Sequence, residues 1–93
     1  MFIISLNYLV ELEHVDQAIP AHLEWLEQNY ADGVFLASGR KTPRTGGVIL
    51  ASGLDRAELE SRLATDPFNL QGIAEYSVIE FEPSKLRDGV RLG

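Results

Sequence analysis

The segment Val34–Ser52, VFLASGRKTPRTGGVILAS, predicts two strands joined by a tight connection. Val34–Lys41 and Gly46–Ser52 are rich in branched and aromatic residues, as strands are. Thr42–Gly47 carries a proline and two glycines where the backbone must turn. The pattern therefore predicts a β-hairpin in the middle of the chain. Gly39, inside the first of its strands, predicts a bulge or the close approach of another group to the backbone.

A helix is predicted before the hairpin. Asp32-Gly33 ends it, with the glycine suited to the left-handed cap position. Its start lies either near His14–Asp16, with Pro20 distorting the second turn, or at Pro20 itself. We favour the longer helix because the helical spacing of one stripe of side chains begins early. The stripe consists of Val15, Ile19, His22, Leu26 and Tyr30.

The chain begins with a predicted strand over Phe2–Leu9. This run is almost continuously apolar, which is typical of a central strand buried on both faces. Glu11–His14 is then a polar connection to the first helix. At the other end of the chain, Ala74–Glu82 predicts a fourth strand, which Pro83 terminates.

The second helix follows the hairpin and has a clear start. Asp55 is a good N-cap, and Glu58 stands three residues later, as in a capping box. The helix must stop before Pro67, because the residue preceding a proline disfavours the helical region. Asp66–Gly72 is then predicted to form a structured turn, with a short 3₁₀ segment as one form of it.

The element order β-α-β-β-α-β predicts an α+β, ferredoxin-like fold: a four-stranded antiparallel sheet with both helices on one face. We expect one domain over residues 1–82 and a short polar tail over residues 83–93. The opposite face of the sheet is left bare. A second copy of the chain is the economical cover, so a homodimer is expected.

Composition excludes several classes of function. The chain has 93 residues, and its 14 acids against 8 bases give a net charge of −6. An acidic chain argues against binding to nucleic acid or to an anionic membrane surface, both of which need basic residues. There is no cysteine, the start lacks the basic region of a signal peptide, and no apolar run approaches the ~20 residues of a membrane span. We therefore expect a soluble, cytoplasmic protein.

His22 and Asp66 are the first candidates for chemistry. His22 lies within an apolar helical stripe, and an inward histidine is either a hydrogen-bonded core residue or part of a site. Asp66 precedes Pro67, where an aspartate commonly caps the following turn. A functional role requires the two side chains to meet. The fold places its helices side by side, which makes that meeting plausible, but sequence does not show the distance.

The hairpin supplies a second candidate. Ser38, Gly39 and Arg40, together with Arg44, offer a glycine opening followed by cations, which suits an anionic small molecule such as a carboxylate or enolate. The alternative is a solvated hairpin tip whose cations offset local acids. His14 is interpreted as a surface residue, and its spacing from His22 matches none of the histidine pairs that bind zinc, so no metal site is expected.

Four stretches in this order resemble the YciI-like (YCII-related) domain family. They are Ala21-His22-Leu23-Glu24-Trp25-Leu26, Gly33-Val34-Phe35-Leu36-Ala37-Ser38-Gly39, Gly47-Val48-Ile49-Leu50 and Asp66-Pro67-Phe68. The resemblance spans about residues 1–82. It implies a dimeric α+β barrel, in which two sheets pack face to face, and small enzymes in some members. Some relatives eliminate chloride from hydroxylated aromatic ring-cleavage intermediates.

The resemblance also implies roles for particular residues. The histidine and aspartate that meet in the pocket of the family match His22 and Asp66. Phe68, in the same motif as the aspartate, is expected to contact the ligand. Many relatives have proline after the Ser-Gly pair, where this chain has Arg40, which changes either the charge of the pocket or only the edge of the strand.

Three hypotheses follow. In the first, the protein is an enzyme that needs no cofactor, and His22, oriented by Asp66, moves a proton in an elimination, isomerisation or proton transfer on a small oxygenated acid or phenol. In the second, a non-catalytic homodimer binds a small ligand or a partner protein in the same pocket. In the third, His22 and Asp66 only tie the helices together, and no pocket lies beside them.

Overall fold

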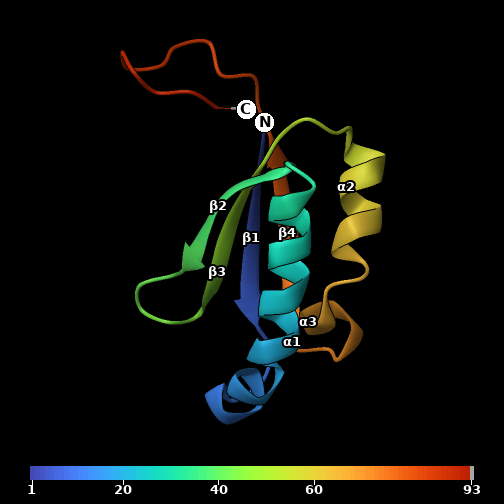
Figure 1. Ribbon diagram of the computed structural model, residues 1–93. Helices are drawn as coiled ribbons and strands as arrows, with labels where there is room; N and C mark the ends of the chain where they lie inside the picture. Colours follow the sequence, from blue (N-terminus) through green and yellow to red (C-terminus); the bar gives the residue numbers. More distant parts are fainter. Residues whose placement is uncertain (93) are drawn as a thin grey trace.

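A single four-stranded sheet organises the computed structural model, which describes residues 1–92 (Figure 1). Its strands are β1 (Phe2–Tyr8), β2 (Phe35–Arg40), β3 (Gly46–Ala51) and β4 (Ala74–Glu80). They lie in the order β2-β3-β1-β4, and each neighbouring pair is antiparallel. This is the predicted ferredoxin-like topology, with the hairpin of β2 and β3 at one edge.

Three helices accompany the sheet: α1 (Leu12–Ala31), α2 (Arg56–Leu63) and α3 (Pro67–Leu70). Figure 1 shows α1 and α2 side by side over one face of the sheet, with α3 near the end where β1 stops. Asp55 caps α2 by accepting a hydrogen bond from the backbone N–H of Glu58 at 2.8 Å, as the sequence predicts.

The core lies between the sheet and the helices. Successive residues of a strand point to opposite faces, so Phe2, Ile4 and Leu6 of β1 share the helix-covered face, and all three are buried. Ile3 and Ser5 on the other face are only half-buried, and Asn7 is exposed. The prediction that β1 is buried on both faces is therefore wrong for the single chain, because nothing in residues 1–92 covers the second face.

Three predicted boundaries are corrected. Helix α1 is the longer of the two alternatives and contains Pro20, but it begins at Leu12, inside the segment predicted to be a polar connection. The turn after Asp66 forms one α-helical turn, α3, rather than a 3₁₀ segment. Strand β4 ends at Glu80, two residues before its predicted end.

The irregularity in β2 is not where the glycine predicted it. The pairing of β2 with β3 shifts register between Phe35 and Ala37, whereas Gly39 pairs regularly with Val48. A Cβ atom added at Gly39 would meet nothing within 4 Å, so the space beside its Cα is open. The bulge expected at Gly39 is therefore wrong, whereas the approach of another group to its backbone stays a prediction.

The end of the chain carries no helix or strand over residues 81–92, and Figure 1 shows it looping away from the sheet near the N-terminus. Gly93, the last residue of the predicted tail, lies outside the described residues. Within the described part of the chain, no helix combines the length and apolar character needed to cross a membrane.

Candidate active site

His22 of α1 and Asp66 of the α2–α3 connection are in direct contact. The His22 Nδ1 atom lies 2.8 Å from Oδ1 of Asp66. The side chain of Asp66 is fully buried, and that of His22 is 12% exposed. The contact that the sequence left open is therefore present, at one end of the helix-covered face of the sheet.

Asp66 owes its position to the local sequence. It is the N-cap of α3, with an extended backbone (φ −61°, ψ 127°), and its Oδ1 accepts the backbone N–H of Phe68 at 3.0 Å. Pro67 stands at the first position of that helix, where its missing N–H costs no hydrogen bond. The cap thus turns the carboxylate inward, toward α1, and holds it there.

Tyr76 of β4 is a third member of the group, which the sequence analysis did not single out. Its hydroxyl donates to Oδ2 of Asp66 at 2.5 Å. Burial, followed by the hydrogen bond to Asp66, raises the pKa of Tyr76 far above its usual range, so the hydroxyl stays protonated and remains a donor. Alternation along β4 places Tyr76 on the helix-covered face, but no sequence signal identifies Asp66 as its partner.

The hydrogen bonds to Asp66 indicate which ring nitrogen of His22 is the donor. The Asp66 carboxylate accepts from Phe68 and Tyr76, and as a carboxylate it also accepts from His22. Nδ1 of His22 is therefore the donor, so in the neutral imidazole Nε2 is the nitrogen with the lone pair. This is the arrangement by which a buried carboxylate fixes one tautomer of a histidine base.

Aromatic contacts fix the plane of the imidazole. The His22 ring stacks on Phe68 with centroids 3.9 Å apart and planes 3° apart, and on Trp25 at 5.7 Å and 29°. The indole N–H of Trp25 donates to the carbonyl of Arg62 and the hydroxyl of Thr65, which anchors it against α2. His22 is thus held in both position and orientation.

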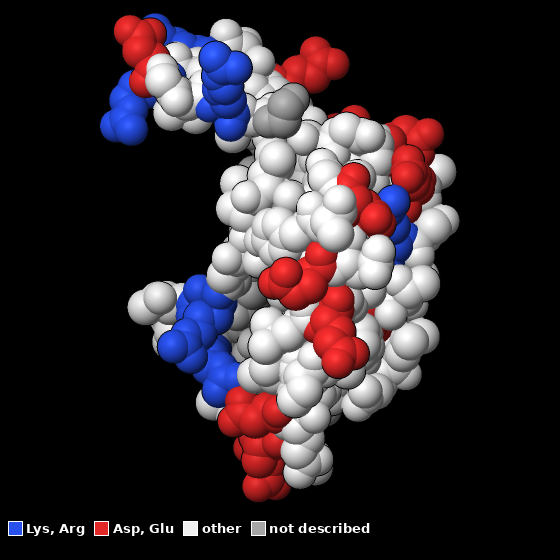
Figure 2. All heavy atoms as spheres, viewed as in Figure 1, with Lys and Arg blue, Asp and Glu red and all other residues white. Residues whose placement is uncertain are grey.

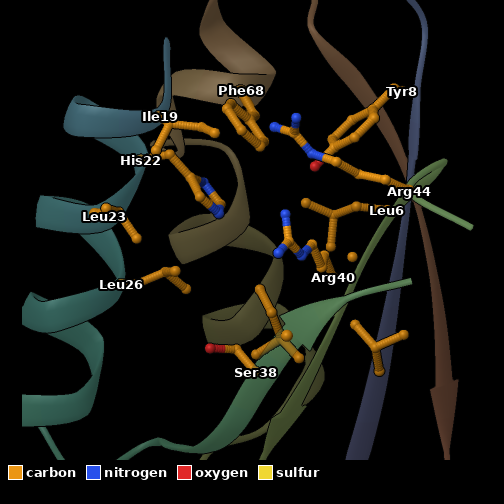
Figure 3. A pocket seen from close by; sticks show the side chains of 14 residues that line it. Leu6, Tyr8, Ile19, His22, Leu23, Leu26, Ser38, Arg40, Arg44 and Phe68 are labelled. Carbon is orange, nitrogen blue, oxygen red and sulfur yellow. The ribbon is translucent and has the colours of Figure 1, made fainter. Parts of the chain in front are cut away.

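A pocket of about 330 Å³ opens beside His22 (Figure 3). Its walls are mainly apolar and come from α1 and the sheet. The side chains that form them include Leu6, Ile19, Leu23, Leu26 and Ile49. A cavity of this size, with few polar groups, suits a molecule of about one ring.

The predicted hairpin residues lie on the opposite wall. Ser38, Gly39, Arg40, Arg44 and Phe68 all line the pocket together with His22, whereas Asp66 lies behind the histidine. In Figure 3 the Arg40 side chain points from β2 into the space that His22 faces from α1. The structure thus gathers the sequence candidates around one cavity; their roles there remain proposals.

Charge is distributed unevenly around this cavity. Arg40 and Arg44, two of the eight basic residues in the chain, line it, whereas Lys41 lies on the other face of the sheet. Figure 2 shows the blue cations of the hairpin beside a hollow in the surface, whereas red carboxylates lie over the helices. Asp16 accepts a hydrogen bond from Arg44, which raises the pKa of that guanidinium. A cationic wall in an acidic protein favours an anionic ligand.

Among residues 1–92, no three His, Cys, Asp or Glu side chains are grouped so as to hold a metal ion. The histidine that lines the pocket contacts Asp66 through Nδ1, and its ring stacks on Phe68 and Trp25.

Fold and site together define a small α+β protein with a buried His-Asp pair beside an apolar, partly cationic pocket. A model of the YCII-related domain matches residues 1–82, so the chain belongs to that family. Among solved structures, it is similar to 5-chloro-2-hydroxyhydroquinone dehydrochlorinase from Burkholderia phenoliruptrix in complex with 2,5-dihydroxybenzoquinone. The TM-score is 0.73 and the identity 19%, over 88% of this chain and 94% of that chain, which shows a shared fold. No curated protein matches the chain.

Proposed function

We propose that the protein is an enzyme that uses His22 and Asp66 for acid–base chemistry on a small oxygenated organic acid or phenol. The observation that carries this proposal is the 2.8 Å contact between Nδ1 of His22 and the fully buried Asp66 carboxylate, at the wall of a pocket. A purely structural pair would need no cavity beside it. The reaction class is elimination, isomerisation or proton transfer, because these need only a base that gains and returns protons.

The residues then take distinct roles. Nε2 of His22 accepts a proton from a substrate hydroxyl, and Asp66 stabilises the imidazolium that forms. The guanidinium group of Arg40 or of Arg44 faces the oxyanion that develops on the substrate. The apolar walls hold the ring and exclude water, which strengthens both interactions. Proton transfer of this kind needs no cofactor.

Elimination of hydrogen chloride from a chlorinated hydroxyhydroquinone, the reaction in the name of the structural relative, illustrates the chemistry. His22 takes a hydroxyl proton and returns it to the carbon that bears chlorine, so that the ring ketonises and His22 is again a free base. His22 then removes a second hydroxyl proton, and chloride leaves with the electron pair of its bond. The product is a hydroxyquinone, and one HCl is lost without any external oxidant.

Chloride release tests the proposal. The wild-type protein is incubated with 5-chloro-2-hydroxyhydroquinone and with other chlorinated phenols and hydroxy acids, and compared with His22→Gln. We expect release above the rate in buffer and a fall of about 100-fold or more in the variant, with binding retained. Binding without turnover of any compound would indicate the non-catalytic ligand-binding module instead. A lowered melting temperature as the only effect of His22→Gln would indicate a structural pair.

We further propose that the open face of the sheet binds a second copy of the chain. One cross-strand row of side chains on that face is apolar on all four strands: Ile79, Ile3, Leu50 and Ala37. Ile79 is 59% exposed in the single chain. A chain of this length has a thin core, and a two-fold packing of the sheets would bury this row against its own copy.

A further inference from the structure

The helix-covered face of the sheet carries a second cross-strand row, directly under the pocket. Register pairs Arg40 of β2 with Gly47 of β3, Gly47 with Leu6 of β1, and Leu6 with Tyr76 of β4. One end of the row is the cation, and the other end is the residue that holds Asp66. Gly47 lies between Arg40 and Leu6 and has no side chain, so the floor of the pocket is open beside the guanidinium.

Arg40 differs from the other two cations of the hairpin. Lys41 donates to Ser5 and Asn7 at 2.8 Å each, on the open face of the sheet, and Arg44 is paired with Asp16. Within residues 1–92, no carboxylate forms an ion pair with Arg40. Its side chain lines the pocket and points toward the space in front of His22 (Figure 3).

We infer that the pocket takes a hydroxylated ring compound that carries a carboxylate, with the carboxylate on Arg40 and the reacting hydroxyl at His22. This inference rests on the proposed function and narrows its substrate class. A guanidinium binds a carboxylate through two parallel hydrogen bonds, which fixes the direction of the ligand as well as its charge. The apolar walls between the two polar ends accept the ring itself.

The dimensions and charge of the site favour a monoanion. A volume of about 330 Å³ is at the lower end for small-molecule sites, which suits one ring with small substituents. Of the two cations that line the pocket, Arg40 is the one that no carboxylate of the described chain pairs with, so one negative charge matches it. A phosphate dianion would leave a charge unpaired against apolar walls, which is costly.

Binding of two probes that differ only in the carboxylate tests this. The dissociation constants of 2,5-dihydroxybenzoate and of hydroquinone are measured by calorimetry for the wild type, Arg40→Gln and Arg56→Gln. Arg56 is the matched control, because it lies on α2 and pairs with Glu60 instead of lining the pocket. We expect the wild type and Arg56→Gln to bind the carboxylate at least about tenfold more tightly than hydroquinone. Arg40→Gln should bind 2,5-dihydroxybenzoate and hydroquinone with similar dissociation constants.

Equal affinities in the wild type, a preference that survives in Arg40→Gln, or no binding of either probe would overturn the inference. The circular dichroism spectrum of the backbone amides of each variant establishes that the variant is folded. The experiment measures no turnover, so its failure would leave acid–base catalysis by His22 and Asp66 standing. Conversely, a carboxylate preference without chloride release or any other turnover would remove the proposed function and keep the binding site.

Discussion

Nδ1 of His22 lies 2.8 Å from Oδ1 of Asp66, although the two residues are 44 positions apart in the chain. The contact joins the middle of α1 to the N-cap of α3, and Tyr76 supports it from the sheet. Because Asp66 caps a helix and orients a histidine with the same carboxylate, its structural and chemical roles are separable only by a substitution that preserves shape.

Asp66→Asn is that substitution. The amide keeps the shape and one acceptor oxygen but removes the charge that stabilises a protonated His22. We expect kcat for an identified substrate to fall by roughly 10²- to 10⁴-fold, with little change in KM. Steady-state kinetics beside circular dichroism measure this. An unchanged kcat in the folded variant would mean that Asp66 only caps α3.

Tyr76→Phe removes the hydroxyl that satisfies Oδ2 of Asp66 and leaves that buried oxygen unpaired. We expect a loss of about 1–3 kcal/mol in the free energy of unfolding, measured by urea denaturation. Tyr30→Phe is the control, because its hydrogen bond to Ser38 at 2.7 Å is exposed to solvent. That variant should change stability by no more than about 0.5 kcal/mol. Equal losses in the two variants would contradict the buried network.

Gly46→Ala tests the packing of β3 against β1. A Cβ atom at Gly46 would lie 1.7 Å from the carbonyl oxygen of Leu6. This oxygen belongs to the backbone, so it cannot rotate away from the clash as the end of a side chain could. We expect the free energy of unfolding of this variant to fall by about 3 kcal/mol or more, or the variant to fail to fold. Gly39→Ala, where a Cβ meets nothing within 4 Å, should be neutral or stabilising by up to about 1 kcal/mol. The reverse order of stability would show that the β1–β3 register is wrong.

Ile79→Lys tests the proposed homodimer. A lysine in the apolar row of the open face would place two like charges near the two-fold axis or bury one charge without a partner. Analytical ultracentrifugation should show a dimer for the wild type and a monomer for the variant. Leu70→Lys alters a leucine on α3 that is even more exposed than Ile79 but lies away from that face, and this variant should remain dimeric. A monomeric wild type, or a dimeric Ile79→Lys, would exclude this interface.

The sequence predicted the order of elements because each depends on local signals. The hairpin at Thr42–Gly47, the cap at Asp55 and the stop at Pro67 act within a few residues, and the structure confirms the topology they define. The bulge near Phe35 was not predicted, because it arises from the pairing of two strands and not from a local signal. The glycine at position 39 led to a prediction at the wrong place.

The candidate site was harder to predict because it depends on contacts between distant segments. The apolar stripe predicted that His22 points inward, and the place of Asp66 before Pro67 made it a candidate partner, which the family resemblance supported. No spacing in the sequence gives the distance between α1 and the start of α3. Tyr76 was missed because alternation along a strand gives the face of a side chain and not its partner. The sequence also could not distinguish the roles of Arg40 and Arg44. They differ because Asp16 pairs with Arg44, whereas no carboxylate of residues 1–92 pairs with Arg40.

A crystal of the wild-type protein soaked with 2,5-dihydroxybenzoquinone tests the central claim most directly, because that claim is the position of His22 relative to a ligand. We predict the ring between the apolar walls of the pocket, with one oxygen within about 3.2 Å of Nε2 of His22 and Nδ1 still on Asp66. A ring bound elsewhere on the protein while the pocket stays empty, or a His22 turned away from the bound ring, would contradict the account.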